Sequence, residues 1–381
     1  MRLNSKLKTQ NSKPQKLVPL LLAWFAVNAR DLPWRRTRDP YAIWISEIML
    51  QQTQVKTVIP FWERWLRELP TIEAAAKAPS AKIHKLWEGL GYYTRVRNLQ
   101  KAAQEIVKSG KRKAEGGNSI CGFPEKFEEI LELPGIGRYT AGAICSIAFN
   151  QPTPILDGNV IRVLTRIFGI AEKPKERQTN ERLWELAEEL VHHASRITHH
   201  SSLACSNLNQ SLMELGALIC TPRSPQCLIC PVKKRCVAFA EKRTEELPNL
   251  GKREAATARQ FIAFVVERNG RFLVRQRPAG VVNAHLWEFP NAETADTKSA
   301  ARVIFKHIFG IEPMEIQPLG TVKHAITRYR ITLEAFAVSA ETMPKQIAGV
   351  WKTPAQLELL AFTSAHKKLA SAAAKSILSG R

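Results

Sequence analysis

The chain has 381 residues, 45% of them hydrophobic, so it is long and apolar enough for two or three domains with sizeable cores. Its 56 Lys and Arg residues outnumber its 34 Asp and Glu residues, which leaves a formal net charge of +22. This excess indicates a polyanionic partner, most simply nucleic acid, although charge alone does not separate DNA, RNA and an anionic membrane surface.

The N-terminal segment allows two interpretations. Residues 1–15 are basic and polar and predict a flexible tail, and the apolar run LVPLLLAWFAV follows. This arrangement imitates a secretory signal. We favour an amphipathic core helix, partly because of the cysteine pattern described below, with an apolar stripe of Leu17, Leu20, Leu21, Trp24 and Val27. Nothing else approaches the roughly 20 apolar residues of a membrane span.

Residues 16–243 predict a mainly α-helical region. Apolar residues recur with helical spacing in several segments, and turn signals such as Leu69-Pro70-Thr71 and Gly116-Gly117-Asn118 separate these segments. Residues 110–122 predict a surface loop.

The C-terminal part predicts a different architecture. Residues 244–258 are charged and poor in bulky apolar side chains, which is typical of a linker. Two β-rich runs then flank Asn269-Gly270, a strong hairpin signal. With a helix at 299–310 and a strand pair near 328–338, residues 259–372 predict an α+β domain.

Four of the seven cysteines form a compact group with the spacing C-x6-C-x2-C-x5-C. Such clustering favours a metal site over disulfides, with the ligands Cys220, Cys227, Cys230 and Cys236. Thiolates suit an iron–sulfur cluster or zinc. Zinc is the less favoured alternative, because zinc sites more often combine two distant C-x2-C pairs. The spacing resembles the [4Fe–4S] loop of the endonuclease III-like DNA glycosylases, which implies a [4Fe–4S] cluster over residues 220–236. The other three cysteines lie apart and are predicted to be free thiols, namely Cys121, Cys145 and Cys205. Free thiols fit a reducing compartment.

Residues 133–142, LPGIGRYTAG, combine a Gly-x-Gly turn with the start of a helix. A dinucleotide-binding loop does not fit, because Thr140 replaces its third glycine and the preceding segment is helical, and a P-loop lacks its Gly-Lys-Ser/Thr. The stretch resembles a helix–hairpin–helix motif, in which Gly135 and Gly137 let backbone N–H groups approach a DNA phosphate. A plain tight turn is the alternative.

Further stretches resemble the MutY family of adenine DNA glycosylases within the same superfamily. Tyr139 stands where the bifunctional relatives carry a lysine nucleophile, and tyrosine forms no Schiff base. The resemblance implies a monofunctional glycosylase of base excision repair that removes adenine opposite 8-oxoguanine or guanine. The stretches that carry it are RDLPWR at 30–35, SEIMLQQTQV at 46–55, GLGYYTRVRNL at 89–99, LDGNV at 156–160 and MELGALIC at 213–220.

The resemblance assigns roles to two carboxylates. Glu47 lies on an apolar helix face, where desolvation raises a carboxyl pKa and suits a general acid; in the family this glutamate protonates N7 of the flipped adenine. A surface glutamate beside a core stripe is the alternative. Asp157, for which an N-cap is the alternative, would stay ionised and support the oxocarbenium-like sugar. Tyr139 and Asn159 would help to position the sugar and the carboxylates.

Other residues are implied in base and DNA binding. Gln51 and Tyr92 match family residues that push into the duplex when the base leaves the stack, and core packing is the alternative for Tyr92. The adenine pocket would be formed by Arg30, Leu32, Trp34, Arg35 and Gln210. The segment before Gln210 departs from the family in length and composition.

The C-terminal domain resembles the MutT-like (Nudix-fold) domain of this family through FLVRQRP and LWEFP. The helix SAARVIFKHIFG lacks the glutamates of a Nudix hydrolase, so we expect a domain that reads the opposite base. Where the family often has Phe-Ser-His, this chain has Ile326-Thr327-Arg328, in which Thr327 keeps a hydroxyl for the oxidised guanine.

Three rival functions remain to be separated from adenine excision. Tyr139 opposes an added lyase step, the two carboxylates Glu47 and Asp157 oppose a purely structural DNA-binding role, and the missing acidic helix opposes a nucleotide pyrophosphohydrolase. We expect a monomer in a bacterial cytoplasm, associated with the nucleoid and not with a membrane. The expected partner is double-stranded DNA that contains an A:8-oxoguanine or A:G mispair.

Overall fold

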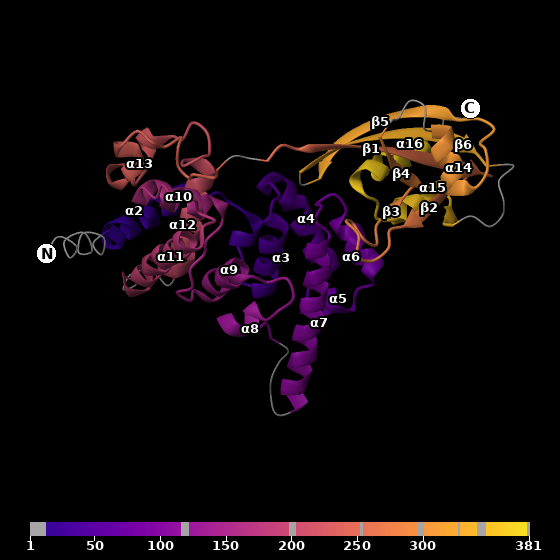
Figure 1. Ribbon diagram of the computed structural model, residues 1–381. Coiled ribbons are helices and arrows are strands. Elements are labelled where there is room, and N and C mark those ends of the chain that lie inside the picture. Colours follow the sequence, from indigo (N-terminus) through magenta and orange to yellow (C-terminus); the bar gives the residue numbers. More distant parts are fainter. Residues whose placement is uncertain are drawn as a thin grey trace. The chain divides into compact units, whose positions relative to one another are not determined.

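The computed structural model describes residues 13–115, 122–197, 203–251, 254–295, 301–326, 328–340 and 348–378 (Figure 1). The chain divides into two compact units. The first comprises Met1–Lys77 and Asn98–Arg253, and the second comprises Ala78–Arg97 and Glu254–Arg381. The sequence indicated one helical region over 16–243, whereas the structure groups residues 78–97 with the C-terminal part.

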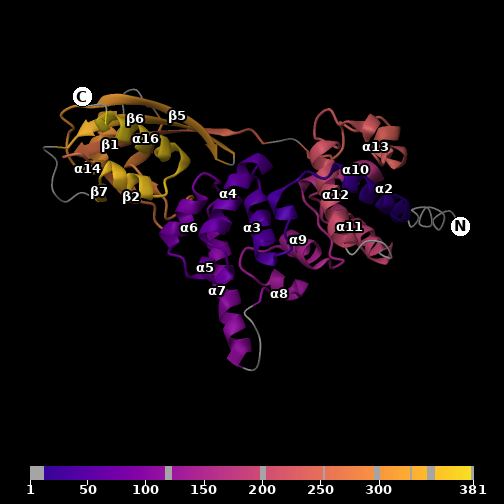
Figure 2. The ribbon, with the colours of Figure 1, turned by 180° about the vertical axis from the view of Figure 1, so that it is seen from behind.

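The first unit is helical, as predicted. In Figures 1 and 2, α2, α10, α11 and α12 gather into one bundle, and their apolar side chains form a common core. The elements of this unit are α2 (Lys13–Asn28), η1 (Pro33–Arg35), α3 (Pro40–Leu50), α4 (Val55–Glu68), α5 (Ile72–Lys77), α7 (Thr94–Glu115, from Asn98), α8 (Phe127–Leu131), α9 (Arg138–Phe149), α10 (Gly158–Phe168), α11 (Arg177–Ile197), α12 (Ala204–Leu218), η2 (Cys227–Ile229), η3 (Lys233–Arg235) and α13 (Val237–Ala240).

The N-terminal core helix is confirmed, but its predicted apolar stripe is partly wrong. Val27 is 83% exposed, and Leu20 is exposed as well. The buried face instead runs through Leu17, Val18, Leu21 and Phe25, because α2 packs with that face against α11 and α12. No helix among the described residues is long and apolar enough to cross a bilayer.

Two predicted boundaries also shift. Residues 110–115 belong to the last turns of α7 and are not part of a loop, because KRKAE consists of good helix formers. Residues 116–121 lie outside the described part of the chain. The linker ends earlier than predicted, since β1 begins at Thr257.

Helix α3 is buried on every side, which is why it has no polar face in the sequence. All nine residues from Tyr41 to Met49 are buried. Asp39 caps its first turn by accepting hydrogen bonds from Tyr41 N and Ala42 N (3.0 and 3.3 Å), and Pro40 fits the first helical position. This helix therefore holds its one acid, Glu47, inside the protein.

The second unit is built on a seven-stranded sheet with the order β3-β2-β1-β6-β5, where β4 pairs with β1 and β7 with β2. The central pair, β1 and β6, is parallel and the other pairs are antiparallel. This confirms the predicted α+β domain. Its elements are α6 (Ser80–Trp87), the first turn of α7, β1 (Thr257–Arg268), β2 (Arg271–Gln276), β3 (Trp287–Glu288), β4 (Asn291–Thr294), α14 (Ala301–Phe309), β5 (Gln317–Ile326), β6 (Tyr329–Ser339), β7 (Val350–Lys352), α15 (Pro354–Leu359) and α16 (Ser364–Leu378).

Strand β1 is apolar on both faces because helices cover both. Ile262 and Phe264 belong to a core that includes α14, while Ala263 and Val265 belong to a core that includes α15 and α16. The predicted hairpin joins β1 to β2, and Arg268 pairs with Arg271. Asn269 and Gly270 both have positive φ (50° and 71°), as a type I′ turn requires.

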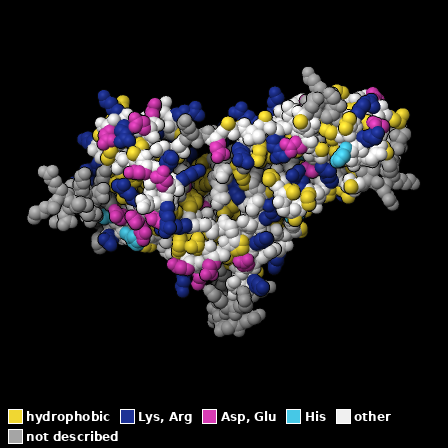
Figure 3. All heavy atoms as spheres, viewed as in Figure 1, with side chains coloured by type: hydrophobic (Ala, Val, Ile, Leu, Met, Phe, Trp, Pro, Cys, Tyr) yellow, Lys and Arg dark blue, Asp and Glu magenta, His cyan; other side chains and the backbone are white. Residues whose placement is uncertain are grey.

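Charged side chains are mixed over the described surface. On the face in Figure 3, Lys and Arg side chains are scattered with acidic side chains among them. On that face the excess positive charge is therefore not gathered into a single patch.

Candidate active site

A cavity of about 500 Å³ in the helical unit brings the predicted site residues together. Its walls come from η1, α3, α9, α10 and α12 and from the loop before η1. The predicted residues that line it are Glu47, Tyr139, Asp157 and Asn159, the pocket residues Arg30, Leu32, Trp34, Arg35 and Gln210, and Gln51. The sequence interpretation thus selected residues from five separate segments that meet in space.

Glu47 is a buried acid that can hold a proton near neutral pH. It is 4% exposed on α3, and its Oε2 accepts a hydrogen bond of 2.8 Å from the hydroxyl of Tyr139. Burial raises the pKa of Glu47 to about 7, and the nearby Asp157 also raises it, against the lowering effect of the Tyr139 hydrogen bond. The alternative of a surface glutamate is therefore wrong.

Asp157 both caps a helix and faces the cavity. Its Oδ1 accepts from Val160 N (2.7 Å), and its Oδ2 accepts from Asn159 Nδ2 (2.9 Å). Burial raises the pKa of Asp157, whereas these donors and the charge of Arg162 favour its ionised form. The N-cap alternative is thus correct as geometry, and it coexists with a position in the cavity wall.

Tyr139 lies in the first turn of α9. Its hydroxyl also lies 3.4 Å from Met213 Sδ. Burial, followed by the charges of Glu47 and Asp157, raises the pKa of Tyr139 well above its usual value, so the phenol stays neutral and donates its proton. None of the described residues that line the cavity is a lysine.

A buried glutamate that the sequence interpretation missed holds the two arginines of the predicted adenine pocket. Glu214 on α12 is 1% exposed. Arg30 Nε and Nη2 donate to its two carboxyl oxygens at 2.8 and 2.7 Å, and Arg35 Nη1 and Nη2 donate to the same oxygens at 3.1 and 3.0 Å. Burial alone would raise the pKa of Glu214, but these bonds lower it to about 2. Its signal was the single charged residue of a helix that carries no other, four residues after Gln210.

The remaining pocket wall combines an amide with apolar surface. Gln210 Oε1 accepts from Arg35 Nε (2.9 Å), and its Nε2 donates to Ser206 Oγ (3.1 Å), so both ends of the amide are held. Trp34 is buried and packs edge-on against Trp62, with ring centroids 6.0 Å apart. Such a mixture of rings and fixed polar groups is typical of a site for a flat heteroaromatic ligand.

A second missed residue, Arg162, links the catalytic segment to the cysteine loop. Its Nη2 donates to Asn159 Oδ1 and to Gly216 O, both at 2.8 Å, and its Nε donates to Cys220 O at 2.7 Å. Since Asn159 in turn donates to Asp157, one chain of hydrogen bonds runs from the loop to the carboxylate. The sequence held no signal for this contact, because the two ends lie 58 residues apart.

The predicted helix–hairpin–helix is formed by α8, a turn and α9. Gly135 has a φ of +77°, and a Cβ there would lie 2.6 Å from Asn98 Cβ, so this glycine is required by conformation and by packing. Gly137 is extended at the N-cap of α9, where a Cβ would meet no atom within 4 Å. That open N-terminus leaves room for an approaching anion.

The two residues expected to enter the duplex lie in different units. Gln51 ends α3, lines the cavity and donates to Thr140 Oγ1 (3.4 Å). Tyr92 belongs to the second unit, is 44% exposed and has a φ of +48°. The alternative of core packing for Tyr92 is therefore wrong.

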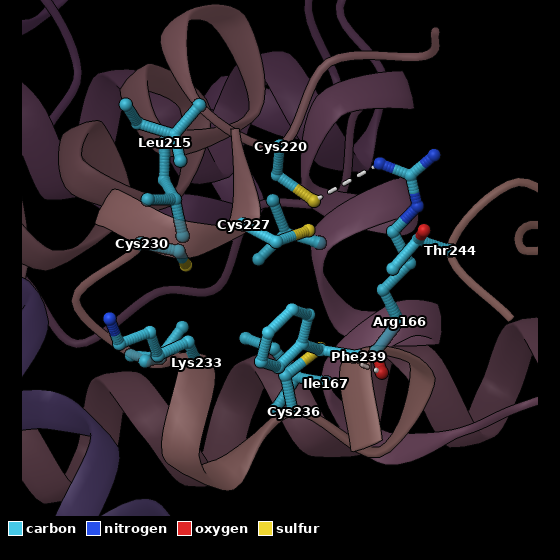
Figure 4. A pocket seen from close by; sticks show the side chains of 13 residues that line it. Arg166, Ile167, Leu215, Cys220, Cys227, Cys230, Lys233, Cys236, Phe239 and Thr244 are labelled. Atoms are coloured by element: carbon cyan, nitrogen blue, oxygen red, sulfur yellow. Dashed lines mark hydrogen bonds between the residues drawn. The ribbon is translucent and has the colours of Figure 1, made fainter. Parts of the chain in front are cut away.

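All four clustered cysteines line one cavity in the helical unit and surround a common space (Figure 4). Arg166 Nη1 donates to Cys220 Sγ (3.4 Å), and Cys236 Sγ donates to Arg166 O (3.4 Å). Among the described residues, no three His, Cys, Asp or Glu side chains are arranged to hold a single metal ion. Two cations, Arg166 and Lys233, line the same mainly apolar cavity, and its four soft thiol donors suit an iron–sulfur cluster or zinc.

The second unit has a cavity of its own, of about 510 Å³. Tyr92 and Tyr93 form one part of its lining, and the end of β5 (His324–Ile326) forms another. Thr327 lies outside the described residues. Helix α14 contains no acid, as the sequence showed, so it lacks the side chains of a Nudix hydrolase helix.

Comparisons with known proteins agree with both units. Residues 45–189 match the HhH-GPD superfamily of base excision DNA repair proteins, and residues 262–372 match the NUDIX domain. The adenine DNA glycosylase of Mus musculus is 32% identical over 408 residues, which cover 92% of this chain and 76% of that protein. The Arabidopsis thaliana adenine DNA glycosylase is 37% identical over 344 residues, covering 78% of this chain and 52% of that protein, so the chain spans about half of that relative.

A solved structure supports the helical fold. A thermostable thymine-DNA glycosylase is 31% identical, with a TM-score of 0.52, and the match covers 61% of this chain and 99% of that one. The chain therefore belongs to the adenine DNA glycosylase family of base excision repair, with a helical HhH-GPD region and a mixed α/β, Nudix-like C-terminal domain.

Proposed function

We propose that the protein excises adenine from A:8-oxoguanine and A:G mispairs in double-stranded DNA by hydrolysing the N-glycosidic bond. The observation that carries this proposal is the pair of buried carboxyls in one cavity. Glu47 has a pKa near neutrality, and Asp157 receives hydrogen bonds that favour its ionised form. One acid and one carboxylate are the groups that the hydrolysis of a glycosidic bond requires.

In the proposed reaction, Glu47 delivers its proton to N7 of the flipped adenine. The bond between C1′ and N9 then breaks, and its electron pair leaves with a neutral adenine. Asp157 stabilises the positive charge on the sugar, and a water molecule adds to C1′ and releases a proton. Tyr139, neutral and hydrogen-bonded to Glu47, keeps that carboxyl turned into the cavity.

The adenine pocket is proposed to be set by the arginine pair and Gln210. Glu214 forms ion pairs with both Arg30 and Arg35, and Gln210 accepts a hydrogen bond from Arg35. The positions of both guanidinium groups are therefore fixed before a base enters. A preorganised pocket binds its ligand without spending binding energy on ordering side chains.

The enzyme is proposed to be monofunctional. A Schiff-base step needs an amine near the sugar carbon, and the described cavity lining offers the phenol of Tyr139 and no lysine. We expect an intact abasic strand that breaks only in alkali, with little adduct after borohydride. Efficient borohydride trapping of wild-type protein on DNA would contradict this.

The four-cysteine loop is proposed to hold a [4Fe–4S] cluster, ligated by Cys220, Cys227, Cys230 and Cys236. The cluster would supply structural cross-linking of the loop rather than acid–base chemistry, since thiolates bound to iron are poor proton donors. Such a cluster fits a reducing compartment, and the described cysteines are free thiols rather than disulfides.

The C-terminal domain is proposed to read the base opposite the adenine. Its cavity is lined by Tyr92, the residue expected to enter the duplex, and by the end of β5 that precedes Thr327. A single-turnover assay tests the whole proposal on duplexes with A opposite 8-oxoguanine, G or T. Excision restricted to the first two supports it, whereas equal excision from A:T would refute it.

A further inference from the structure

The loop that carries Tyr92 has a preformed shape. We define the Tyr92 loop as residues 88–93, between α6 and α7. Trp87 Nε1 donates to Gly91 O (3.1 Å), and Arg95 Nη2 donates to Leu90 O and Gly91 O (3.1 and 3.2 Å). The left-handed φ of Tyr92 is thus held by bonds on both sides of the loop.

Glu88, the first residue of this loop, is a buried anion that accepts hydrogen bonds from residues near the C-terminal end of the domain. It is 4% exposed, and its Oε1 accepts from the backbone N–H of Phe362 (2.9 Å). Its Oε2 accepts from Lys367 Nζ (2.7 Å) and from Lys85 Nζ (2.9 Å). Lys85 Nζ also donates to Leu360 O (2.9 Å). One carboxylate therefore joins segments about 270 residues apart in sequence.

These contacts require the charge of Glu88. Burial would raise the pKa of Glu88, yet the bonds from Lys367, Phe362 and Lys85 lower it, so the group stays ionised. Glu88→Gln keeps an oxygen that can accept from Phe362 N–H, but it removes the negative charge that holds Lys367 and Lys85 against the carboxylate.

The segment around Phe362, which donates to Glu88, also forms part of the wall of the C-terminal cavity. Phe362 is followed directly by Thr363 and Ser364, which line that cavity together with Tyr92. A second contact supports the same junction, because Arg97 Nη1 donates to Ala284 O (3.2 Å), beside the cavity residue Asn283. Hydrogen bonds between side chains and main-chain atoms therefore hold the Tyr92 loop and the adjoining start of α7 against the cavity wall.

We propose that Glu88 is a positioning residue that locks the Tyr92 loop to the opposite-base cavity, so that insertion of Tyr92 and recognition of 8-oxoguanine occur as one event. The inference rests on the proposed function, and it adds a residue and a coupling to it. Without this lock, contact between the cavity and 8-oxoguanine would no longer hold the Tyr92 loop in place, so insertion opposite the lesion would be less complete.

The test uses Glu88→Gln, Lys367→Met and the double variant in the full-length protein. Lys306→Met is the matched control, because Lys306 on α14 of the same unit forms an exposed ion pair with Glu312 and does not line the cavity. Two quantities are measured: the ratio of single-turnover excision rates for A:8-oxoguanine and A:G, and the fluorescence of 2-aminopurine placed beside the mispair, which reports insertion.

We expect both single variants to lower the rate ratio about tenfold, within the usual range for coupling between two sites, and to reduce the fluorescence change on A:8-oxoguanine. The double variant should be no worse than the poorer single variant, since both remove one interaction. The control should match wild type.

An unchanged rate ratio and an unchanged fluorescence change in both single variants would overturn the proposal, even if thermal stability fell. Failure of the proposed function looks different. In that case wild type itself would excise adenine from A:T as fast as from the two mispairs, and the fluorescence change would still report whether Glu88 positions Tyr92.

Discussion

The hydroxyl of Tyr139 donates a 2.8 Å hydrogen bond to Glu47, and the same cavity contains Asp157. In the bifunctional relatives that the sequence resembles, the place of Tyr139 is taken by a lysine nucleophile. Here a neutral phenol orients the proton donor instead. In the proposed reaction this contact sets the position of the acid, and the phenol offers no amine for a covalent step.

The first prediction concerns the pH dependence of excision. Because burial raises the pKa of Glu47 to about 7, the single-turnover rate should fall as the pH rises through that value and Glu47 loses its proton. Glu47→Gln should remove this limb of the profile. A wild-type rate that stays constant between pH 6 and 9 would contradict the assignment of Glu47 as the acid.

Stability should follow pH through the same group. The folded pKa of Glu47 is raised above the ordinary value of 4.5, so its contribution to stability is most favourable below that value and is lost as the pH rises towards about 7. Wild type should therefore lose stability relative to Glu47→Gln across this window. Denaturant unfolding at pH 5 and pH 8 measures the difference, which must grow with pH.

Glu214 should be essential for the adenine pocket. Glu214→Gln leaves two arginines without their shared anion, which should cost on the order of 3 kcal/mol of unfolding free energy and lower excision more than DNA binding. Glu181→Gln, which breaks only the exposed pair with Arg177, is the matched control and should cost at most about 1 kcal/mol.

The pH dependence of this loss has a definite sign. The folded pKa of Glu214 is depressed to about 2, so the stability it contributes is present above about 4.5 and disappears as the pH falls towards 2. The difference between wild type and Glu214→Gln should accordingly shrink below pH 4.5. A difference that is the same at pH 3 and pH 7 would argue against the ion cluster.

Gly216 should be required for the position of Asn159. A Cβ at Gly216 would lie 2.7 Å from Asn159 Cβ, although alanine is the better helix former. Gly216→Ala should therefore lower the excision rate while the lesion duplex still binds. Glu181→Ala, at an exposed position of α11 in the same unit, serves as the control for a change to a good helix former. Equal effects of both changes on excision would show that Asn159 is not the target.

The metal content of the purified protein tests the cysteine loop. Four iron atoms per chain and a brown colour are expected, and Cys230→Ser should lose iron. One zinc and no iron would show that the alternative held. Cys230→Ser protein that keeps the full iron content would remove Cys230 from the ligand set.

The helical region and the α+β domain could both be predicted from the sequence because their signals are local. Helical periodicity marked α4 and α11, and Asn269-Gly270 marked the β1–β2 hairpin. Glu47 and the four cysteines stood out because an acid on an apolar face and a tight C-x2-C group are unusual without a function.

Contacts between distant segments could not be read in this way. Nothing in the sequence joins Glu88 to Phe362 or Arg162 to Cys220, because a salt bridge or a carbonyl contact leaves no spacing pattern. The buried face of α2 was misjudged for a related reason, since it is chosen by the helices packed against it. The grouping of residues 78–97 with the C-terminal strands is likewise a result of tertiary packing.

The most direct test of the central claim compares wild type with Glu47→Gln on a duplex that contains A opposite 8-oxoguanine. Single-turnover excision, scored after alkali, should fall by about 10²–10⁴-fold in the variant because one general acid is lost. Binding of the same duplex should survive, because the other contacts remain. Adenine release by Glu47→Gln at a rate near that of wild type would contradict the account.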